Sequence, residues 1–388
     1  MSTAATAPQP HLVHGMGVDP VEPDWPALTL EELAEVLRTY PEAGLGGRSG
    51  GGIRLLWLSP RPLSAAALVG VPGGTFFVKR HHDSVRPAAS LREEHDFLIH
   101  LRAHSAPVVR VLVDESGLTV HKRGPWTYEV HTVGEGQDLY QDAISWSPFA
   151  DIDHAHAAGA ALARLHAAAQ GYDAPHRGAA PLVAGFSVFA ADDPVAAVED
   201  YAAARPAVAA ELAERRGWRE DLERWHLPFH RRLLPHLAEL EPLWAHGDFH
   251  ASNLLWRDGR VSSVIDFSLC DRAYAVHDLA TAIERNTVEW VELDEKGAAA
   301  VHTEAALALI AGYEQIRRLS DAERAALPEL LALCHVDYAL SEIDYFRGAT
   351  GSAANTELAY RYLVDHTAFF AGPIGSELLD AIREELAR

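Results

Sequence analysis

The stretch His246-Gly-Asp-Phe-His-Ala-Ser-Asn253 decides the fold predicted for this chain, together with Val264-Ile-Asp-Phe-Ser268 just after it. These two stretches hold three polar side chains of interest, the carboxylates of Asp248 and Asp266 and the amide of Asn253. Transfer of a phosphoryl group requires a metal that neutralises charge and a carboxylate that orients and deprotonates the attacking hydroxyl. One free carboxylate beside one amide–carboxylate pair therefore predicts phosphoryl-transfer chemistry.

A hairpin between the two stretches supplies the geometry. Asp258-Gly259 is flanked by short apolar runs, a strong hairpin signal because both central turn positions favour positive φ. With this turn Asn253 is expected to face Val264, and Asp266 lies on the same face one diagonal step on. That diagonal is roughly 7–8 Å, close enough for an amide oxygen and a carboxylate to share one magnesium ion.

The spacing resembles that of known kinases. Asp248 and Asn253 match the Asp-x-x-x-x-Asn catalytic loop, and Asp266-Phe267 resembles the Asp-Phe-Gly element. His-Gly-Asp-Phe-His-x-x-Asn followed by Val-Ile-Asp-Phe resembles the aminoglycoside phosphotransferase family, which includes choline, homoserine and antibiotic kinases. Gly247 follows the small-molecule version of the loop, since protein kinases have His-Arg-Asp there.

Two positions depart from the family pattern. Ala251-Ser252 replaces a common Pro-Gly, and Ser268 replaces the last glycine of Asp-Phe-Gly. Neither departure touches an expected ligand position. The resemblance covers roughly residues 53–285, with specific motifs at 246–266 and at 278–280, and it implies that Asp278 braces the catalytic loop.

Two other classes of function compete with this interpretation. His246, Asp248 and His250 alternate, so on a strand they would share a face and could ligate zinc in a metallohydrolase. A catalytically silent kinase-like protein that binds small molecules is the second alternative. Against it, all five polar positions implied by the resemblance are intact: Lys79, Glu94, Asp248, Asn253 and Asp266.

Composition limits the possible partners. About half of the 388 residues are hydrophobic, which is enough for a full core. A net charge of -22 argues against nucleic acid and anionic membranes, because both require a basic patch. Only Cys270 and Cys334 occur, and neither a signal peptide nor a membrane span is recognisable, so a cytoplasmic location is expected. The sequence does not indicate an oligomeric state.

The order of expected elements predicts an α+β, bilobal, protein-kinase-like fold. Residues 1–26 are proline-rich and are expected to form a mobile tail. Residues 27–133 are expected to form a small β-rich lobe with strands near 53–58, 65–71, 75–80, 108–113, 118–122 and 127–132, and helices at 29–40 and 90–101. Residues 134–388 are expected to form a large, mostly helical lobe that carries the catalytic loop and the substrate site.

Lys79 is the expected phosphate-binding lysine. The chain has only three lysines against thirty arginines, and Lys79 ends the apolar run Phe76-Phe-Val. The position resembles the third-strand lysine of kinases, which pairs with the nucleotide phosphates and with a helix glutamate. Glu94 is the preferred partner over Glu93, because it shares the inward helix face with Phe97, three residues on.

Other nucleotide contacts are expected from two loops and a strand end. The loop Ser59–Ser64 lies where the kinase phosphate loop belongs and would use backbone donors or its two serines. The glycine cluster 44–52 competes with it, but precedes the first strand. By resemblance to the family, the backbone of His131 and Val133 is expected to contact the nucleobase.

The phosphate acceptor is expected to lie against the C-terminal helices. Asp337, Ser341 and Asp344 share one helix face, beside Tyr338 and Tyr345, and acids next to aromatic rings suit an amino sugar or another cationic alcohol. A polar stripe on an amphipathic helix gives the same pattern without any substrate role. The two further candidates for the same cleft are Glu284 and Glu289.

The combined prediction is a magnesium-dependent kinase of small molecules. Asp248 would orient the acceptor hydroxyl, Asn253 and Asp266 would hold Mg²⁺, and Lys79 would hold the nucleotide phosphates. The γ-phosphate of ATP or GTP would pass to an amino sugar, an aminoglycoside-like antibiotic or an amino alcohol.

Overall fold

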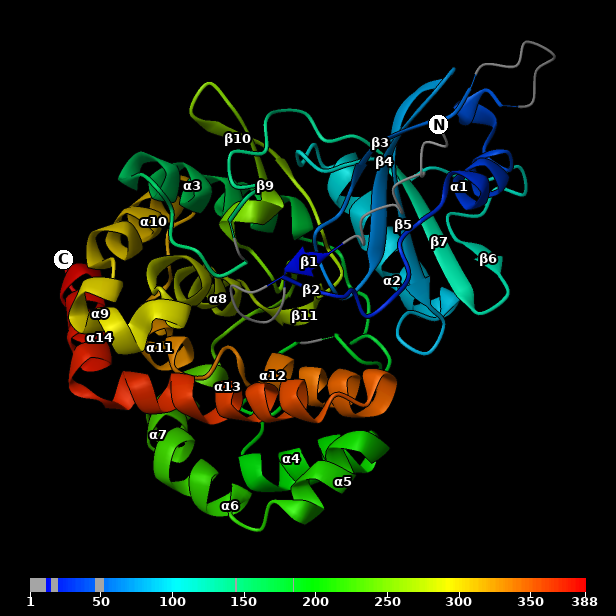
Figure 1. The fold of residues 1–388 in the computed structure, drawn as a ribbon. Helices are drawn as coiled ribbons and strands as arrows, with labels where there is room; N and C mark the ends of the chain where they lie inside the picture. Colours follow the sequence, from blue (N-terminus) through cyan, green and yellow to red (C-terminus); the bar gives the residue numbers. More distant parts are fainter. Residues whose placement is uncertain (1–11, 15–19, 46–51, 144, 184) are drawn as a thin grey trace, which may run out of the picture. The chain divides into compact units, whose positions relative to one another are not determined.

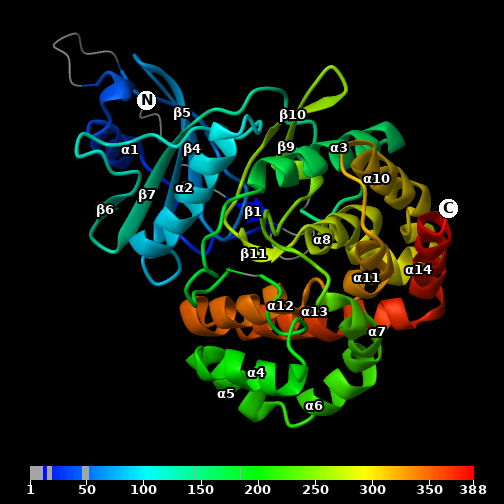
Figure 2. The same cartoon turned by 180° about the vertical axis from the view of Figure 1, so that it is seen from behind.

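The computed structural model describes residues 12–14, 20–45, 52–143, 145–183 and 185–388. The chain divides into two compact units (Figures 1 and 2). Unit 1 comprises residues 1–83 and 111–133, and unit 2 comprises residues 84–110 and 134–388. Unit 1 is β-rich and unit 2 is mainly helical, so the predicted α+β class is confirmed.

Unit 1 is built on one antiparallel sheet with the strand order β3-β4-β5-β7-β6. The strands are β3 (Arg54–Leu58), β4 (Ala65–Val71), β5 (Gly74–His82), β6 (His121–Arg123) and β7 (Trp126–Thr132). The predicted strand at 108–113 does not form, because its only sheet-like contacts are single bridges at Val108 and Val111.

Helix α1 (Leu30–Leu37) covers one face of this sheet and closes its core. Thr29 and Glu32 form the capping box, each side chain bonding to the other residue's backbone N–H. Leu33, Val36 and Leu37 are buried against apolar side chains of β4, β5 and β7. The helix begins at Leu30, directly after the capping residue Thr29, and ends at Leu37, three residues before the predicted end at Tyr40.

Part of the segment predicted as a tail lies within unit 1. β1 (Val13–His14) pairs with β2 (Pro20–Val21) in antiparallel register, and Val13 is buried. Trp25 stacks on the ring of His82 with 4.8 Å between ring centroids. The predicted first lobe, 27–133, is not continuous in the structure. Its residues 84–110 belong to unit 2.

Unit 2 contains that segment, helix α2, and the remaining helices. These are α2 (Ala88–Ala103), α3 (Ile152–Ala169), α4 (Pro194–Ala203), α5 (Pro206–Glu214), α6 (Trp218–Asp221), α7 (Leu227–Leu237), α8 (Ala275–Thr287), α9 (Leu293–Lys296), α10 (Thr303–Ile316), α11 (Asp321–Leu331), α12 (Val336–Ile343), α13 (Ala353–Ala371) and α14 (Pro373–Leu386). π-helical turns, η2 (Leu222–His226) and η6 (Asp344–Thr350), join α6 to α7 and extend α12. Short 3-10 turns are η1 (Pro41–Ala43), η3 (Ala251–Asn253), η4 (Trp290–Glu292) and η5 (Gly297–Ala300).

Helices α3 and α10 pack side by side at very close range (Figure 1). Two glycines permit this approach, because a Cβ at Gly159 would lie 1.9 Å from the carbonyl oxygen of Leu309, and one at Gly312 equally close to that of His156. The crossing places His166 of α3 and Tyr313 of α10 within hydrogen-bond distance, at 2.7 Å. Through His166, this pair contacts Asp278, which binds the start of the loop at 246–253.

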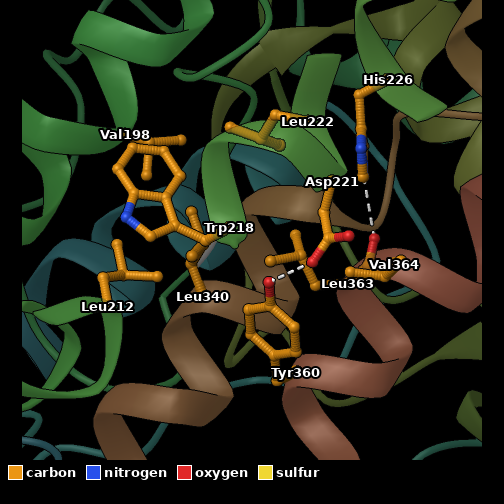
Figure 3. Close-up of a pocket in the computed structure, with 10 residues that line it drawn as sticks. All are labelled: Val198, Leu212, Trp218, Asp221, Leu222, His226, Leu340, Tyr360, Leu363 and Val364. Carbon is orange, nitrogen blue, oxygen red and sulfur yellow. Dashed lines mark hydrogen bonds between the residues drawn. The ribbon is translucent and has the colours of Figure 1, made fainter. Parts of the chain in front are cut away.

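A helical layer formed by α4, α5 and α6 covers the far side of α12 and α13 (Figures 1 and 2). The space between them is a cavity of about 10 Å³, lined by Trp218, His226 and Tyr360 among others (Figure 3). Tyr360 donates to Asp221 across it, at 2.7 Å. The cavity has room for a single water at most, so it is a small gap in the packing of these helices and too small to be a substrate site.

Two short ladders complete unit 2 and frame the catalytic segment. β8 (Pro242–Ala245) pairs with β11 (Asp271–Tyr274), and β9 (Leu254–Arg257) pairs with β10 (Arg260–Val264). The chain thus leaves β8, forms the loop 246–253, and enters the hairpin. Among the described residues, no helix is both long and apolar enough to cross a membrane.

Candidate active site

Gly247 gives the catalytic loop its turn. Its φ is +77°, in the left-handed region, and a Cβ there would lie 2.7 Å from the carbonyl oxygen of Leu269. The glycine therefore allows the loop to pass directly against the segment that follows Asp266. This is a physical reason for glycine in the His-Gly-Asp motif.

Asp278, the acidic residue in the first turn of α8, fastens the start of the loop. Its two carboxylate oxygens accept the backbone N–H groups of His246 and Gly247, both at 2.9 Å. His166 Nε2 donates to the same carboxylate at 3.0 Å, and its Nδ1 contacts the Tyr313 hydroxyl. Burial would raise the pKa of Asp278, but His166 and the backbone donors lower it, so the brace is ionised. These contacts agree with the bracing role expected of Asp278, and His166 supports Asp278 in turn.

Asn286, at the other end of α8, fastens the second half of the loop. Its side-chain oxygen accepts the N–H of Ala251 at 2.8 Å, and its amide nitrogen donates to the carbonyl of Phe249 at 3.0 Å. The side chain is fully buried. One helix therefore holds both ends of the loop through backbone groups, and Asp248 lies between the two braces.

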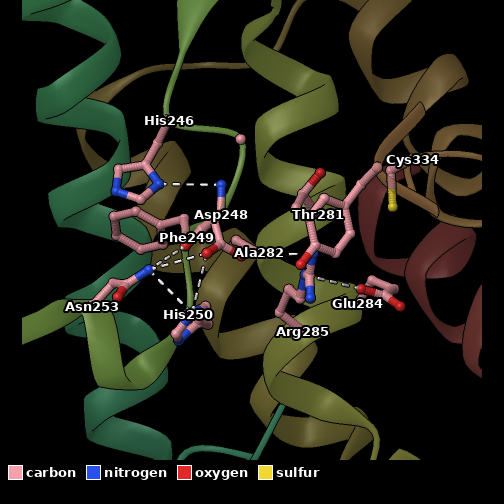
Figure 4. Close-up of polar contacts among 12 residues, drawn as sticks. His246, Asp248, Phe249, His250, Asn253, Thr281, Ala282, Glu284, Arg285 and Cys334 are labelled. Atoms are coloured by element: carbon pink, nitrogen blue, oxygen red, sulfur yellow. Dashed lines mark hydrogen bonds and ion pairs between the residues drawn. The ribbon is translucent and has the colours of Figure 1, made fainter. Parts of the chain in front are cut away.

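Asp248 lies between Asn253 and His250 on one side and Arg285 on the other (Figure 4). Asn253 Nδ2 donates to the Asp248 carbonyl at 2.9 Å, and His250 Nε2 is 3.4 Å from the carboxylate. Arg285 Nη2 is 3.6 Å from Oδ1. Burial would raise the pKa of Asp248, but His250 and Arg285 outweigh it and hold the pKa well below its ordinary range. The side chain is 18% exposed, so a substrate can reach it.

His246 does not fit the zinc interpretation. Its Nδ1 accepts the N–H of Asp248 at 3.1 Å, so its Nε2 carries the proton and donates to the carbonyl of Ile265 at 3.0 Å. Both ring nitrogens are therefore occupied, and neither can ligate a metal. The proposed zinc set of His246, Asp248 and His250 is not supported by this geometry.

The hairpin forms with its predicted turn but with a shifted register. Asp258 and Gly259 both have positive φ, at 51° and 69°, and their flanking arginines face each other. A bulge near Ser262 then moves Val264 opposite Leu254, so the prediction that Asn253 faces Val264 is wrong by one residue. A pairing rule applied from the turn outward cannot anticipate an inserted residue.

The shifted register still brings Asn253 to the residue before Asp266. The carbonyl of Asn253 accepts the N–H of Ile265 at 3.0 Å. Asn253 lies in η3 and not on the strand, and Asp266 follows the strand with φ of +58°. A non-glycine residue in the left-handed region stores strain of about 1–2 kcal/mol, which the surrounding structure must hold in place. The pair thus meets at the strand end and not along one face of a ladder.

Two buried arginines hold the segment after Asp266. Arg86 donates to the carbonyl of Ser268 at 2.7 Å, and Arg177 donates to the same carbonyl at 2.9 Å. The backbone N–H of Arg177 also bonds to Asp271 at 2.9 Å. Asp271 is therefore a structural acceptor. Ser268, which departs from the family pattern, contributes through its backbone oxygen, so the change of side chain leaves these bonds intact.

In unit 1, Lys79 lies in the middle of the sheet and is 8% exposed. The register of β5 and β7 places it opposite Glu129. Glu129 is buried and contacts His81 Nε2 at 2.9 Å and His131 Nε2 at 2.8 Å. Glu129 is a nearby carboxylate that the sequence analysis missed. Alternation along β7 would have placed it on the face of His131.

Glu94 and Glu93 belong to unit 2, so the predicted ion pair of Lys79 with Glu94 joins the two units and stays a prediction. Within unit 2, Glu94 is buried, whereas the side chain of Glu93 is 40% exposed. Arg177 lies 3.8 Å from Glu94 and 3.7 Å from Glu93. The preference for Glu94 as the inward glutamate agrees with this burial.

The remaining nucleotide candidates lie at the edges of unit 1. Ser59 follows β3, and its Oγ accepts the N–H of Arg61 at 3.2 Å, forming a compact serine turn before Ser64 and β4. Val133 is 41% exposed at the end of β7. Most of the competing glycine cluster, residues 46–51, lies outside the described residues. Nucleotide contacts at these positions stay predictions.

Two of the four predicted acceptor residues have structural partners on α12 and η6. Asp337 accepts from the N–H and hydroxyl of Ser187, both at 2.6 Å, and from the N–H of Val188 at 3.2 Å. Asp344 lies 3.9 Å from Arg205 Nε. These contacts use the predicted face of α12 to hold neighbouring segments.

The other two predicted acceptor residues differ from each other. Glu284 lies on α8 and accepts from His366 Nδ1 at 2.6 Å, with Arg285 Nε at 3.7 Å. Glu289 lies beyond the end of α8 and pairs with His302 and Lys296. Glu284 therefore belongs to the cluster behind Asp248, whereas the partners of Glu289 lie around α9.

Arg285 and Glu342 are the main residues of this cluster that the sequence analysis did not single out. Arg285 is seven residues after Asp278, so the two share one face of α8, and this spacing is a signal that could have found it. Glu342 is fully buried on α12, one turn after Tyr338. In the sequence it is one more acid on an amphipathic helix.

Comparison with known proteins identifies the family. Residues 63–319 match the model of the phosphotransferase enzyme family, and the chain belongs to this family. The resemblance inferred from the catalytic loop is thereby confirmed.

Among curated proteins, the chain is similar to the homoserine kinases of two bacteria. It is 30% identical over 185 residues to that of Gluconobacter oxydans (strain 621H), covering 48% of this chain and 51% of the relative. It is 29% identical over 229 residues to that of Gluconacetobacter diazotrophicus, covering 56% and 61%. The matched region thus spans about half to three fifths of the length of these relatives.

Solved structures share the fold at low sequence identity. The microcompartment-associated aminopropanol kinase aligns over 91% of this chain and 100% of its own, with a TM-score of 0.59 and 21% identity. An amicoumacin kinase, in complex with AMP-PNP and Ca²⁺, aligns over 88% and 93% with a TM-score of 0.56 and 18% identity. These likenesses support the kinase-like fold.

Proposed function

We propose that this protein is a magnesium-dependent phosphotransferase that moves the γ-phosphate of ATP to a hydroxyl of a small molecule. The observation that carries the proposal is the position of Asp248. Its carboxylate is ionised, partly exposed, and held by backbone braces at both ends of its loop. In such a reaction this carboxylate accepts the hydrogen bond of the acceptor hydroxyl and takes its proton as that oxygen bonds to the γ-phosphorus and the bond from the γ-phosphorus to ADP breaks.

Asn253 and Asp266 would hold the magnesium ion. Because Asn253 Nδ2 donates to the Asp248 carbonyl, the amide oxygen faces away from the loop. Amide and carboxylate oxygens are hard ligands of the kind that Mg²⁺ prefers. When bound, the ion supplies charge that neutralises the nucleotide phosphates. The strained backbone of Asp266 is consistent with a functional position.

Lys79 is the proposed contact of the α- and β-phosphates. It is buried near the centre of the sheet and lies opposite Glu129 in the register of β5 and β7. Glu94 is its proposed partner from unit 2. His131 and Val133 would contact the nucleobase, and Ser59 and Ser64 the phosphates. Lys79→Arg is expected to be poorly active, because a planar fork does not replace a compact ammonium.

An amine-bearing alcohol is the proposed acceptor class. Three carboxylates, Asp248, Glu284 and Glu342, lie around the single guanidinium of Arg285, so the cluster carries an excess of negative charge. The fold relative that acts on aminopropanol and the homoserine kinase relatives fit this class. Asp337 and Asp344 are weaker candidates for the acceptor contact, because other segments already use them.

The proposed function is tested with radiolabelled ATP and magnesium against matched acceptors. Each pair differs by an amine: 3-aminopropan-1-ol and propane-1,3-diol, homoserine and 4-hydroxybutyrate, glucosamine and glucose. Transfer of label to an amine-bearing member, dependent on magnesium and lost in Asp248→Asn, is the expected result.

Three other results have separate meanings. Transfer of label only to the acceptors without an amine would support the phosphotransferase activity but contradict the proposed amine-bearing acceptor class. Binding of ATP with no consumption under any condition supports the silent binding protein. Turnover that requires zinc instead of magnesium contradicts both.

A further inference from the structure

Arg285 places a fixed positive charge beside the catalytic carboxylate (Figure 4). The residue is 2% exposed on α8, with Nη2 3.6 Å from Asp248 Oδ1 and Nε 3.7 Å from Glu284 Oε2. Both distances are longer than a hydrogen bond. Nε has no hydrogen-bond partner among the described residues. The guanidinium therefore acts on Asp248 through its charge.

Three aromatic rings fix the position of this guanidinium. Its central carbon lies 4.7 Å from the ring centre of Tyr338, 5.4 Å from that of Trp146 and 6.0 Å from that of Tyr362. Each ring offers the negative face of its quadrupole to the cation. The rings come from α12, α13 and the segment before α3. The position of the charge is thus set by packing from three distant parts of unit 2.

Glu342 is the third acidic residue of the cluster around Arg285, after Asp248 and Glu284. It is completely buried, its oxygens have no hydrogen bond of ordinary geometry among the described residues, and the hydroxyl of Tyr338 is the neighbouring donor that acts on it. It lies one turn after Tyr338 on α12, the helix whose ring contacts the guanidinium. Burial raises its pKa to about 7, with Arg285 acting to lower it and the charges of Asp248 and Glu284 to raise it. An acid in this state is half-ionised near neutral pH.

We propose that Arg285 is a positioning residue that holds the Asp248 carboxylate toward the acceptor hydroxyl, and that Glu342 sets how much of the Arg285 charge acts on Asp248. This inference rests on the proposed function. Asp278 and Asn286 bind only backbone groups of the loop, whereas Asn253 Nδ2 and His250 Nε2 each lie 3.4 Å from one carboxylate oxygen of Asp248, Oδ2. Arg285 acts on the other oxygen, Oδ1, and so fixes the second end of the carboxylate.

The charge of Glu342 gives the arrangement a pH dependence. When Glu342 is ionised, it draws on the same guanidinium and repels the charge of Asp248, so Asp248 attracts the hydroxyl proton more strongly. The groups that face Glu342 are Tyr338 on its own helix, Arg285 and Glu284 on α8, Asp248 in the loop and Tyr362 on α13. Turnover is therefore expected to rise as pH increases through about 7.

The first experiment measures magnesium-dependent ATP hydrolysis, with water in place of the acceptor, for wild type, Arg285→Lys and Arg285→Gln. A misplaced catalytic group costs about 10²-fold in rate. We expect Arg285→Gln to lose about that factor in kcat with the KM for ATP unchanged. Millimolar guanidinium should restore part of the rate, and urea should not. Arg215→Gln is the matched control, since Arg215 stacks on Tyr360 at 4.0 Å and pairs with acids away from Asp248.

The second experiment measures the same rate from pH 5.5 to 8.5 for wild type and Glu342→Gln. The wild-type rise near pH 7 should be absent from the variant and retained in Glu211→Gln, a buried acid paired with Arg215 and Arg347. A crystal structure of Arg285→Gln should show the Asp248 carboxylate turned from its present orientation.

The outcomes separate this inference from the function on which it rests. Three outcomes overturn the inference and leave the proposed phosphotransferase function intact. They are an Arg285→Gln enzyme as fast as wild type, an Arg285→Gln enzyme in which only the KM rises, and an unchanged pH profile in Glu342→Gln. A folded wild-type protein that consumes no ATP with any acceptor or with water contradicts the proposed function itself, and the inference with it.

Discussion

The catalytic loop at 246–253 and helix α12 both carry buried polar groups in unit 2, but they are held in different ways. The loop is held through its backbone, by Asp278 at one end and Asn286 at the other. Helix α12 is held through its side chains, with Asp337 bound to the segment at 187–188 and Tyr338 stacked on Arg285. Backbone bracing fixes a conformation for a motif of constant spacing, whereas side-chain bracing depends on partners from anywhere in the chain.

Loss of the backbone brace is expected to have the largest effect on stability. Asp278→Ala leaves the N–H groups of His246 and Gly247 and the ring of His166 without their buried acceptor. Removing one member of such a buried ionic network costs about 3–5 kcal/mol in the free energy of unfolding. Urea unfolding followed by circular dichroism measures it, with Asp365→Ala on the exposed side of α13 as the control. A loss below 1 kcal/mol would mean that the loop is held in another way.

Glu342, the buried acid of α12, is expected to reduce the stability of the folded protein as pH rises. The pKa of Glu342 is raised from 4.5 to about 7 in the folded protein, so its stabilising contribution is complete below 4.5 and is lost as pH increases through 7. Between pH 5 and 8 the wild type should lose about 2–3 kcal/mol relative to Glu342→Gln. Thermal unfolding of the two proteins across this range gives the difference directly. Parallel curves would show that Glu342 has a hydrogen-bonded partner or is ionised throughout.

Loss of a contact made by Asp337 on α12 is expected to have a smaller effect on the free energy of unfolding. In Asp337→Asn, the amide nitrogen meets a donor of Ser187 or Val188 where the carboxylate accepted one. We expect a loss of about 1–3 kcal/mol in unfolding free energy, with the KM for an amine-bearing acceptor unchanged. The measurement is urea unfolding combined with acceptor kinetics. A KM that rises while stability stays constant would restore Asp337 as a substrate contact.

The same contrast explains how much the sequence could predict. The α+β class, the hairpin turn, the helices of unit 2 and the bracing role of Asp278 follow from local patterns: a turn dipeptide, periodicity and a motif of fixed spacing. The register of the hairpin could not be predicted, because the bulge near Ser262 follows from packing beside Gly136 and Glu135 and not from the turn.

The environment of Asp248 was only half predictable. Asn253 is in the same motif, and its contact with the loop follows from the spacing. Arg285 is held by rings from three separate segments, and Glu342 belongs to the cluster through α12, whose Tyr338 ring contacts Arg285 of α8. Helix α12 was expected near the acceptor, which stays a prediction, and the face toward the cluster is that of Tyr338 and Glu342, one position away from the predicted face of Asp337 and Ser341. A rotation of one residue is decided by tertiary contacts.

The most direct test of the central claim is the effect of Asp248→Asn on two quantities measured in one preparation. Removal of a general base typically lowers the rate by ~10²–10⁴, while the loop braces and the proposed metal pair remain. We predict that phosphate transfer to the acceptor, or to water if no acceptor is found, falls by at least this range. The affinity for magnesium and ATP, measured by calorimetry, should stay within a few-fold of wild type. A variant that keeps more than a tenth of the wild-type rate would contradict the assignment of Asp248.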